Sequence, residues 1–467
     1  MTSLDSGKRR AAIGFASALA VAAACTRTAD PVEHYGKAAP VATGGGGKNV
    51  ATGGKASAGQ AGKGSTTGSG GTSATGGDDA VADAGEGGAT GTPPEPPTDY
   101  GCGEAPVSSA AFSRRALRVA AAECAQWHYC RFEGGARALA DALDEQRDEP
   151  TEATVAAARA AFGAAFELAS VNELFQFGPL SSQSESAGKD NYQGKGFREL
   201  IYAWPLSARC RVEEQIVLRS YAQSMNSVLV NGRGLFALDY LLFYPDADTE
   251  CTASSTTGKA WPTLGAEDIA AGKREYAAAL GRDIVHQAQE LRNAWSPDGG
   301  NFTPVFVETT GYPSEQEAMK VLSWSLLYVE REVKDWKLGL PAGHTSSAPV
   351  SVAEAAFSGL KTQAIRQNLI GFRGLFQGCG AGGEGLGFDD WLSEAGHGEL
   401  AADILTAYVA AQAAADNAPA LDQASPAEFE ALYQAVKHLT DLLKNDLFGA
   451  GSPLGLSLPK GIEGDTD

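Results

Sequence analysis

Apolar residues recur at spacings of three and four over most of this chain, from about residue 108 to residue 447. Such spacing places side chains on one face of an α-helix, whereas a half-buried strand would alternate with a period of two. The clearest stripe consists of Phe429, Leu432, Val436, Leu439, Leu443 and Leu447. Strand signals are sparse, and only Phe302 to Val307 is predicted to form a short extended connector. The pattern predicts an all-α protein built from antiparallel helical bundles.

Capping residues locate several of the expected helix starts. Thr151 follows Pro150, and capping boxes begin at Ser314, Ser351 and Ser425. Residues 178–196 are polar and glycine-containing, so they are predicted to form a loop. The expected helices are 110–145 with a break near Gly134, 151–175, 211–229, 266–295, 314–336, one after Ser351 and one after Ser425.

The N-terminal region has the composition of an exported chain. Residues 1–24 combine the basic run Lys8 to Arg10 with a short apolar segment, which predicts a signal peptide too short to span a bilayer. Val21-Ala-Ala-Ala-Cys25 resembles the lipobox of bacterial lipoproteins, which implies lipidation of Cys25. Ordinary secretion is the alternative. The resemblance, with Thr26 rather than Asp after the cysteine, implies anchoring to the outer membrane of the cell envelope.

Residues 25–104 are rich in Gly, Ser, Thr and Pro and carry almost no large apolar side chains. Such a segment cannot bury enough surface to offset its ordering entropy, so it is predicted to be a disordered tether. The whole chain of 467 residues has a formal charge of −20. That charge argues against a nucleic-acid partner, which would call for a basic surface.

Seven cysteines bear on folding in an oxidising compartment. With Cys25 lipidated, six remain, and an even number in an exported chain predicts disulfides. Six cysteines allow about fifteen pairings, among which we favour Cys210–Cys251 because they bracket one buried helix. No tight Cys or His pair predicts a zinc site. His128, next to Trp127 and Tyr129, is the best single ligand candidate among six scattered histidines.

The stretch from Asn231 to Phe243 is the apolar centre of the chain. It is predicted to begin a buried helix, with Gly234 allowing close backbone approach and Asp239 as a lone carboxylate. Asp239 is expected to pair with one of three arginines, either as a structural ion pair or as part of a site. These arginines are Arg198, Arg211 and Arg233.

In its motifs the chain from about residue 108 onward resembles the imelysin-like family of bacterial envelope proteins, and in particular its predicted periplasmic lipoproteins. The landmarks are Phe177-Gly-Pro-Leu180, Ala203-Trp-Pro205, Arg233 to Phe243, Lys337-Leu-Gly-Leu-Pro-Ala-Gly343, Asn368-Leu-Ile-Gly-Phe372 and Leu454-Gly-Leu-Ser-Leu458. The resemblance implies two modified four-helix bundles, which we assign to residues 105–300 and 301–467, with a pocket near their interface. Arg233-Gly-Leu-Phe236 recurs as Arg373-Gly-Leu-Phe376, which favours an internal duplication.

The family was described as peptidases with a Gly-x-His-x-x-Glu motif. On this sequence the motif falls on Gly234, Phe236 and Asp239, so the metal-ligand histidine is replaced by phenylalanine, which has no lone pair to offer a metal. We therefore expect a protein that is not an enzyme, with no assigned metal ligands. An imelysin-type metallopeptidase is the alternative.

What remains is a binding or accessory lipoprotein, which the family resemblance links to iron acquisition. Its ligand-binding residues are predicted to be Arg233, Asp239, Arg373 and Trp204, and its ligand to be iron or another divalent metal. Its partners are predicted to be a membrane, reached through Cys25, and an envelope or iron-uptake protein. A structural or adhesive surface lipoprotein is a further alternative, favoured by the long tether.

Overall fold

The structure is a computed structural model that describes residues 99–182, 194–344, 353–380, 382–459 and 462. The predicted signal peptide, Cys25 and nearly all of the predicted tether lie outside these residues. The described part is all-α, as predicted, and within it the one strand-like pairing is an isolated bridge between Tyr202 and Gly234.

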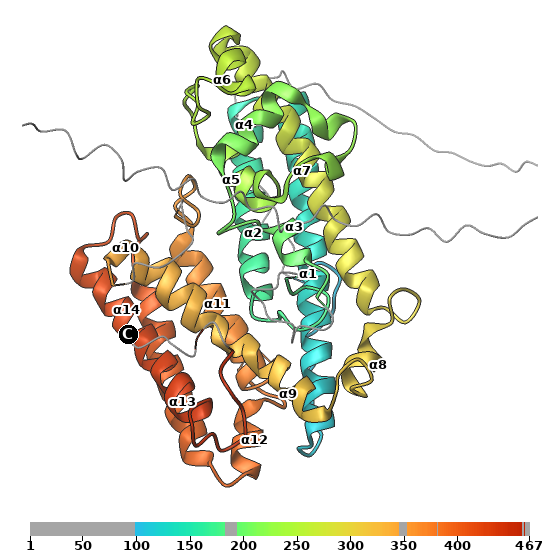
Figure 1. Cartoon of the computed structure of the whole chain (residues 1–467), viewed down its shortest axis with the longest axis vertical. Coiled ribbons are helices and arrows are strands. Elements are labelled where there is room, and N and C mark those ends of the chain that lie inside the picture. Colours follow the sequence, from blue (N-terminus) through green and yellow to red (C-terminus); the bar gives the residue numbers. More distant parts are fainter. Residues whose placement is uncertain (1–98, 183–193, 345–352, 381, 460–461, 463–467) are drawn as a thin grey trace, which may run out of the picture. The chain divides into compact units, whose positions relative to one another are not determined.

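Four helices form the first bundle and lie side by side in Figure 1. They are α1 (Arg114–Asp148), α2 (Glu152–Asn172), α5 (Gly234–Phe243) and α7 (Ala266–Trp295). The predicted break near Gly134 is absent, because α1 runs straight through it and Gly135 packs against Leu168 of α2. The Thr151 side chain caps α2 as predicted. The long helices of this ring bury one stripe each, whereas α5 is buried over nine of its ten residues.

The second bundle is built from the C-terminal half of the described chain, in orange and red in Figure 1. Its helices are α9 (Glu315–Trp324) continued by a π-helix (Val329–Gly339), α11 (Lys361–Phe376), α13 (Gly398–Asn417) and α14 (Pro426–Leu442) continued by a second π-helix (Leu443–Leu447). Ser314 and Ser425 cap α9 and α14 as predicted. Ser351 lies outside the described residues, and the next helix begins only at Lys361.

Short helices complete the described chain: α3 (Phe197–Ile201), α4 (Arg209–Leu218), α6 (Thr256–Ala260), α8 (Phe302–Val307), α10 (Leu340–Ala342) and α12 (Phe388–Glu394). Two local predictions were wrong. The segment 302–307 is the helix α8, because Phe302 and Phe306 lie one turn apart and both pack on Trp295. The helix expected over 211–229 ends at Leu218, where Arg219 adopts a left-handed conformation before three 3₁₀ turns.

The two bundles meet where α11 packs against α2. Small residues permit the close approach, since a Cβ on Gly371 would lie 2.7 Å from the carbonyl oxygen of Val171. By length and composition α2 is apolar enough to cross a membrane, but half of its apolar window is buried inside the protein. Its apolar composition is explained by its contacts with α1, α5 and α11, against which the buried half of the helix packs.

Three disulfides join the six cysteines of the described chain, and the predicted Cys210–Cys251 bond is confirmed. Cys102–Cys130 joins the first described residues to α1, and Cys124–Cys379 joins α1 to the segment after α11. The repeated Arg-Gly-Leu-Phe sequences are not equivalent in the fold. The first opens α5, whereas the second closes α11.

The start of α5 depends on Gly234, which has a φ of +69°. A Cβ there would lie 2.5 Å from the carbonyl oxygen of Ile201. Because this oxygen belongs to the backbone, no side-chain rotation could relieve the clash. Glycine is therefore required both by the left-handed backbone and by the neighbouring chain.

We predict that Gly234→Ala lowers the free energy of unfolding by about 2–4 kcal/mol, because it adds a backbone clash to the cost of the left-handed conformation. Gly343→Ala is the matched control, since Gly343 has a φ of +78° with open space around it. We expect that control to lose only about 1 kcal/mol in urea unfolding. Equal losses in the two variants would show that the contact with Ile201 does not matter.

Candidate functional site at the bundle interface

A buried ammonium group lies at the centre of the bundle interface. Lys337 lies in the last turn of the π-helical segment. Its Nζ is 2.8 Å from Glu354 Oε1, 2.7 Å from Asn368 Oδ1 and 3.3 Å from Glu173 Oε2. These groups come from both bundles: Glu173 follows α2, Asn368 lies on α11, and Glu354 precedes α11. We call these four residues the interface cage. Three oxygen atoms thus surround one cation that belongs to the chain itself.

The carboxylate of Glu173 is the contribution of the first bundle to the cage. It also receives a hydrogen bond from Arg198 Nη2 at 3.1 Å and one from Asn368 Nδ2 at 3.2 Å. Burial raises the pKa of this carboxyl, but the charges of Lys337 and Arg198 and the hydrogen bonds outweigh burial and hold the pKa below its ordinary value. Glu173 is therefore a buried anion matched by two cations.

Glu354 is the second carboxylate of the cage, and it is fully buried. Its Oε1 accepts a hydrogen bond from the Tyr202 hydroxyl at 3.1 Å, while its Oε2 has no hydrogen-bond partner among the described residues. Burial raises the pKa of Glu354 despite the nearby Lys337, and the negative charge of Glu173 raises it further. The two carboxyls of the cage therefore differ: the surroundings stabilise the charged form of Glu173 and disfavour the charged form of Glu354.

Asp239 of α5 does not form any of the expected ion pairs. Its two oxygens accept hydrogen bonds from the backbone N–H groups of Phe357 and Ser358, at 3.1 and 3.0 Å. Burial raises its pKa to about 6, even though these donors act in the opposite direction. The three candidate arginines pair instead with other carboxylates: Arg198 with Glu173, Arg211 with Glu214 and Arg233 with Asp283. Asp239 therefore holds the segment before α11 against α5, which we call the motif helix because it carries the Gly234, Phe236 and Asp239 positions.

The other motif positions serve packing. Phe236 is buried, and its ring lies 6.5 Å from that of Phe357, the residue whose N–H contacts Asp239. The position that would carry a metal-ligand histidine in the family therefore belongs to the aromatic contact between the bundles. Gly234 supplies the close approach described above.

The four predicted ligand-binding residues lie in different surroundings. Trp204 is fully buried beside the cage, with Lys337 Nζ 5.7 Å from its ring centre and Trp336 packed edge-on. Arg233 is committed to Asp283 of α7, at 2.7 Å. Arg373 lies at the last turn of α11 and bonds to Gln377 at 3.1 Å. The structure brings Trp204 and Asp239 to the interface and leaves Arg233 and Arg373 apart from them.

Sequence reasoning missed the four residues of the interface cage. Lys337 and Asn368 do stand in stretches that carry the family resemblance, which was the available signal. The charges of the π-helical segment have the spacing of a solvated helix face, yet nearly all are buried: Glu330, Glu332, Lys334, Asp335 and Lys337. A π-helix has wider turns than an α-helix, so a 3.6-residue pattern misplaces its side chains.

A second buried charge group follows from the same π-helical segment, inside the second bundle. Glu330 Oε1 accepts from Lys334 Nζ at 3.1 Å and from Lys444 Nζ at 2.8 Å. Lys444 lies on the second π-helix, so the two widened segments face each other through one carboxylate. Glu330, Lys334 and Lys444 all belong to the second bundle, and none of them is part of the interface cage.

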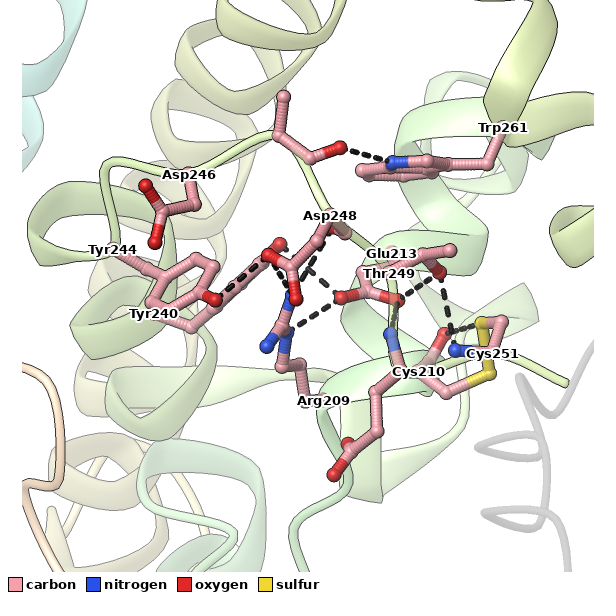
Figure 2. A network of polar contacts seen from close by, with 12 residues as sticks. Arg209, Cys210, Glu213, Tyr240, Tyr244, Asp246, Asp248, Thr249, Cys251 and Trp261 are labelled. Carbon is pink, nitrogen blue, oxygen red and sulfur yellow. Dashed lines mark hydrogen bonds and ion pairs between the residues drawn. A yellow bond between two sulfur atoms is a disulfide. The ribbon is translucent and has the colours of Figure 1, made fainter.

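A third polar network lies around the Cys210–Cys251 disulfide, at α4 and the segment after α5 (Figure 2). Fully buried Glu213 accepts from Arg209 at 2.6 Å, from the Thr249 hydroxyl at 2.6 Å and from the Glu250 N–H at 3.0 Å. The Arg209 guanidinium lies 4.1 Å from the ring centre of Tyr244. Because the Glu213 and Arg209 side chains both hold the segment after α5, this network is structural.

The described residues contain one group of side chains with metal-binding spacing, namely Cys124, His128 and Cys379. Its two sulfurs form a disulfide, and none of the three belongs to the interface cage. His128 is buried, and burial followed by the charge of Arg131 lowers its pKa to about 3, so its ring is neutral.

The fold and its interface define a class of all-α proteins in which two modified four-helix bundles enclose a buried polar site. The imelysin family model (peptidase M75) matches residues 125–445. The chain therefore belongs to the imelysin family.

Two solved structures share the fold. An imelysin-like protein from Psychrobacter arcticum 273-4 is 16% identical with a TM-score of 0.54, covering 74% of this chain and 98% of its own. A protein from Parabacteroides distasonis ATCC 8503, named as an iron-regulated protein A precursor, is 14% identical with a TM-score of 0.50, covering 73% of this chain and 96% of its own. No curated protein matches the chain.

Removal of the Lys337 ammonium tests the importance of the interface cage. We predict that Lys337→Met lowers the free energy of unfolding by about 3–5 kcal/mol, because Glu173 and Glu354 then lose the cation they share in a buried site. Lys320→Met is the control, since Lys320 pairs with Glu317 one turn away on a partly exposed face. We expect the control to change stability by less than about 1 kcal/mol in urea unfolding.

The raised pKa of Asp239 predicts a pH dependence. Because the folded-state pKa of about 6 exceeds the ordinary value of 3.8, the folded protein keeps a proton that the unfolded chain releases between these values. The contribution of Asp239 to stability is therefore greatest below pH 4 and falls as the pH rises toward 6.

Asp239→Asn removes this titration. The difference in free energy of unfolding, wild type minus Asp239→Asn, is expected to fall by about 1–3 kcal/mol between about pH 4 and pH 7. Urea unfolding of both proteins at matched pH values measures it. A difference that stays constant, or rises with pH, would contradict the raised pKa.

Proposed function

We propose that the protein is a non-catalytic binding protein of the cell envelope that serves iron acquisition. The observation that supports the non-catalytic part most directly is the interface cage, where the Lys337 ammonium occupies the place among carboxylate and amide oxygens that a bound metal ion would need. A metal ion entering this cage would have to displace a buried charge of the chain. The cage therefore favours a built-in structural cation over a catalytic metal.

The motif helix supports the same conclusion. Phenylalanine at position 236 offers no lone pair, and its ring is part of the contact between the bundles. Both oxygens of Asp239 already accept hydrogen bonds from backbone N–H groups, so this carboxylate has a structural role in holding the segment before α11. A metallopeptidase centre needs at least three ligands and an open position.

The link to iron is supported by the fold shared with the protein from Parabacteroides distasonis that is named as an iron-regulated protein A precursor. The formal charge of −20 adds a physical reason, because a negative surface raises the local concentration of cations. Lipidation of Cys25 would keep the helical bundles at the membrane face, with the tether predicted for residues 25–104 between them and the lipid. An envelope iron-uptake protein is the partner that this arrangement suits.

Iron titration of the chelator-stripped full chain tests this function. We predict that ferrous ion, ferric citrate or haem raises the melting temperature saturably, as a ligand of the folded state must. Magnesium at the same concentration is the control and should leave the melting temperature unchanged. A flat response to all three iron species would overturn the link to iron.

A peptidase assay tests the non-catalytic part separately. The same preparation should not cleave an unfolded protein substrate, with or without added zinc. Cleavage that a chelator inhibits and Asp239→Asn abolishes would establish the metallopeptidase alternative and overturn the non-catalytic proposal.

A further inference from the structure

Cys124, His128 and Cys379 form a compact cluster away from the interface cage. One ring nitrogen of His128 and the two sulfurs lie within 4.8 Å of one another. Cys124 and His128 are four residues apart on α1, a spacing that puts both side chains on the same face of a helix. Cys379 arrives from the segment after α11, so residues distant in sequence converge on one point.

The surroundings of His128 point to a ligand rather than to packing alone. The residue is 6% exposed, and its Nδ1 atom has no hydrogen-bond partner among the described residues. Its ring lies between those of Trp127 and Phe175, with centres 4.7 and 4.9 Å away. Phenylalanine would fill such an aromatic slot without leaving a buried polar atom unpaired, so a histidine there calls for an explanation.

A glycine borders the cluster on the side of α11. A Cβ on Gly374 would lie 3.9 Å from both Cys124 Sγ and His128 Nε2, so the Cys124 sulfur and the His128 ring both border a position where the chain has no side chain. Cys379 itself is only partly buried and lies between Gly378 and Gly380. Because glycine is conformationally permissive, the backbone at Cys379 can shift. The shift required is the small difference between the sulfur–sulfur distance of a disulfide and that of two thiolates bound to one metal.

We propose that reduction of the Cys124–Cys379 disulfide by a dithiol turns Cys124, His128 and Cys379 into a zinc-binding site. A dithiol reductant gives two electrons and two protons to the disulfide and becomes a disulfide itself, leaving two cysteine thiols. Binding of Zn²⁺ then releases both thiol protons and forms two zinc–sulfur bonds and one zinc–nitrogen bond. The His128 ring contributes a lone pair and loses no proton.

The donor set selects the metal class. Two thiolates and one imidazole favour zinc or a comparably soft ion over magnesium or calcium, which prefer oxygen. Three protein ligands leave the fourth tetrahedral position for water or another small ligand. Either state joins α1 to the segment after α11, through a sulfur–sulfur bond when oxidised and through the metal when reduced.

Cobalt binding by the full chain, reduced anaerobically with a dithiol that is then removed, tests the site. Cobalt(II) replaces zinc in such sites and absorbs strongly in the near ultraviolet when bound to thiolates. We expect one cobalt per chain that zinc displaces, and no such absorption from the unreduced protein. A reduced protein without this absorption would overturn the proposal.

Variants separate this site from the other four thiols that reduction exposes. Cys124→Ser/Cys379→Ser should lose the thiolate absorption, whereas Cys210→Ser/Cys251→Ser should keep it. His128→Phe should weaken binding by at least about tenfold, because loss of even an outer partner of a ligand costs about that much. Absorption that survives in Cys124→Ser/Cys379→Ser, or unchanged affinity in His128→Phe, would show that the metal is bound elsewhere.

If the reduced protein unfolds, recovery of the fold on adding zinc still tests the proposed site. Helix content by circular dichroism should then recover when zinc is added to the reduced wild type, but not when it is added to reduced Cys124→Ser/Cys379→Ser. Equal recovery in the two proteins, or none in either, would contradict the site.

Discussion

The contact of one lysine with two carboxylates from different bundles determines how this protein is held together. Burying Lys337, Glu173 and Glu354 is costly in itself, and the cost is offset only when all three are present in the right geometry. Such a cluster adds little net stability, but it penalises every arrangement of the bundles that would separate its charges. The apolar contact of α2 with α11 favours association of the two bundles, and the interface cage determines how they are positioned against each other.

Two further residues of α5 serve the same interface. Phe236 adds apolar area at the contact between the bundles, and Asp239 binds two N–H groups of the segment before α11. Both positions now serve the interface, so the helix that defines the family keeps its place for packing reasons.

The sequence predicted the fold far better than the site. Helix faces and capping residues are local signals, so the start of α2 at Thr151, that of α14 at Ser425 and the whole of α7 could be predicted from it. The partner of Asp239 could not, because its donors are backbone groups more than a hundred residues away. The burial of Lys337 could not be predicted either, because charged residues on a helix are usually solvated. The π-helical geometry turns this side chain inward.

The Cys102–Cys130 disulfide has a mechanical consequence. It fixes the first described residues to the middle of α1, so a pull applied through the preceding part of the chain enters the first bundle along a covalent bond. The force is then spread along a helix of 35 residues that packs against both α2 and α7. A load applied at Cys102 therefore reaches α1 without first separating residues 103–113 from the bundle.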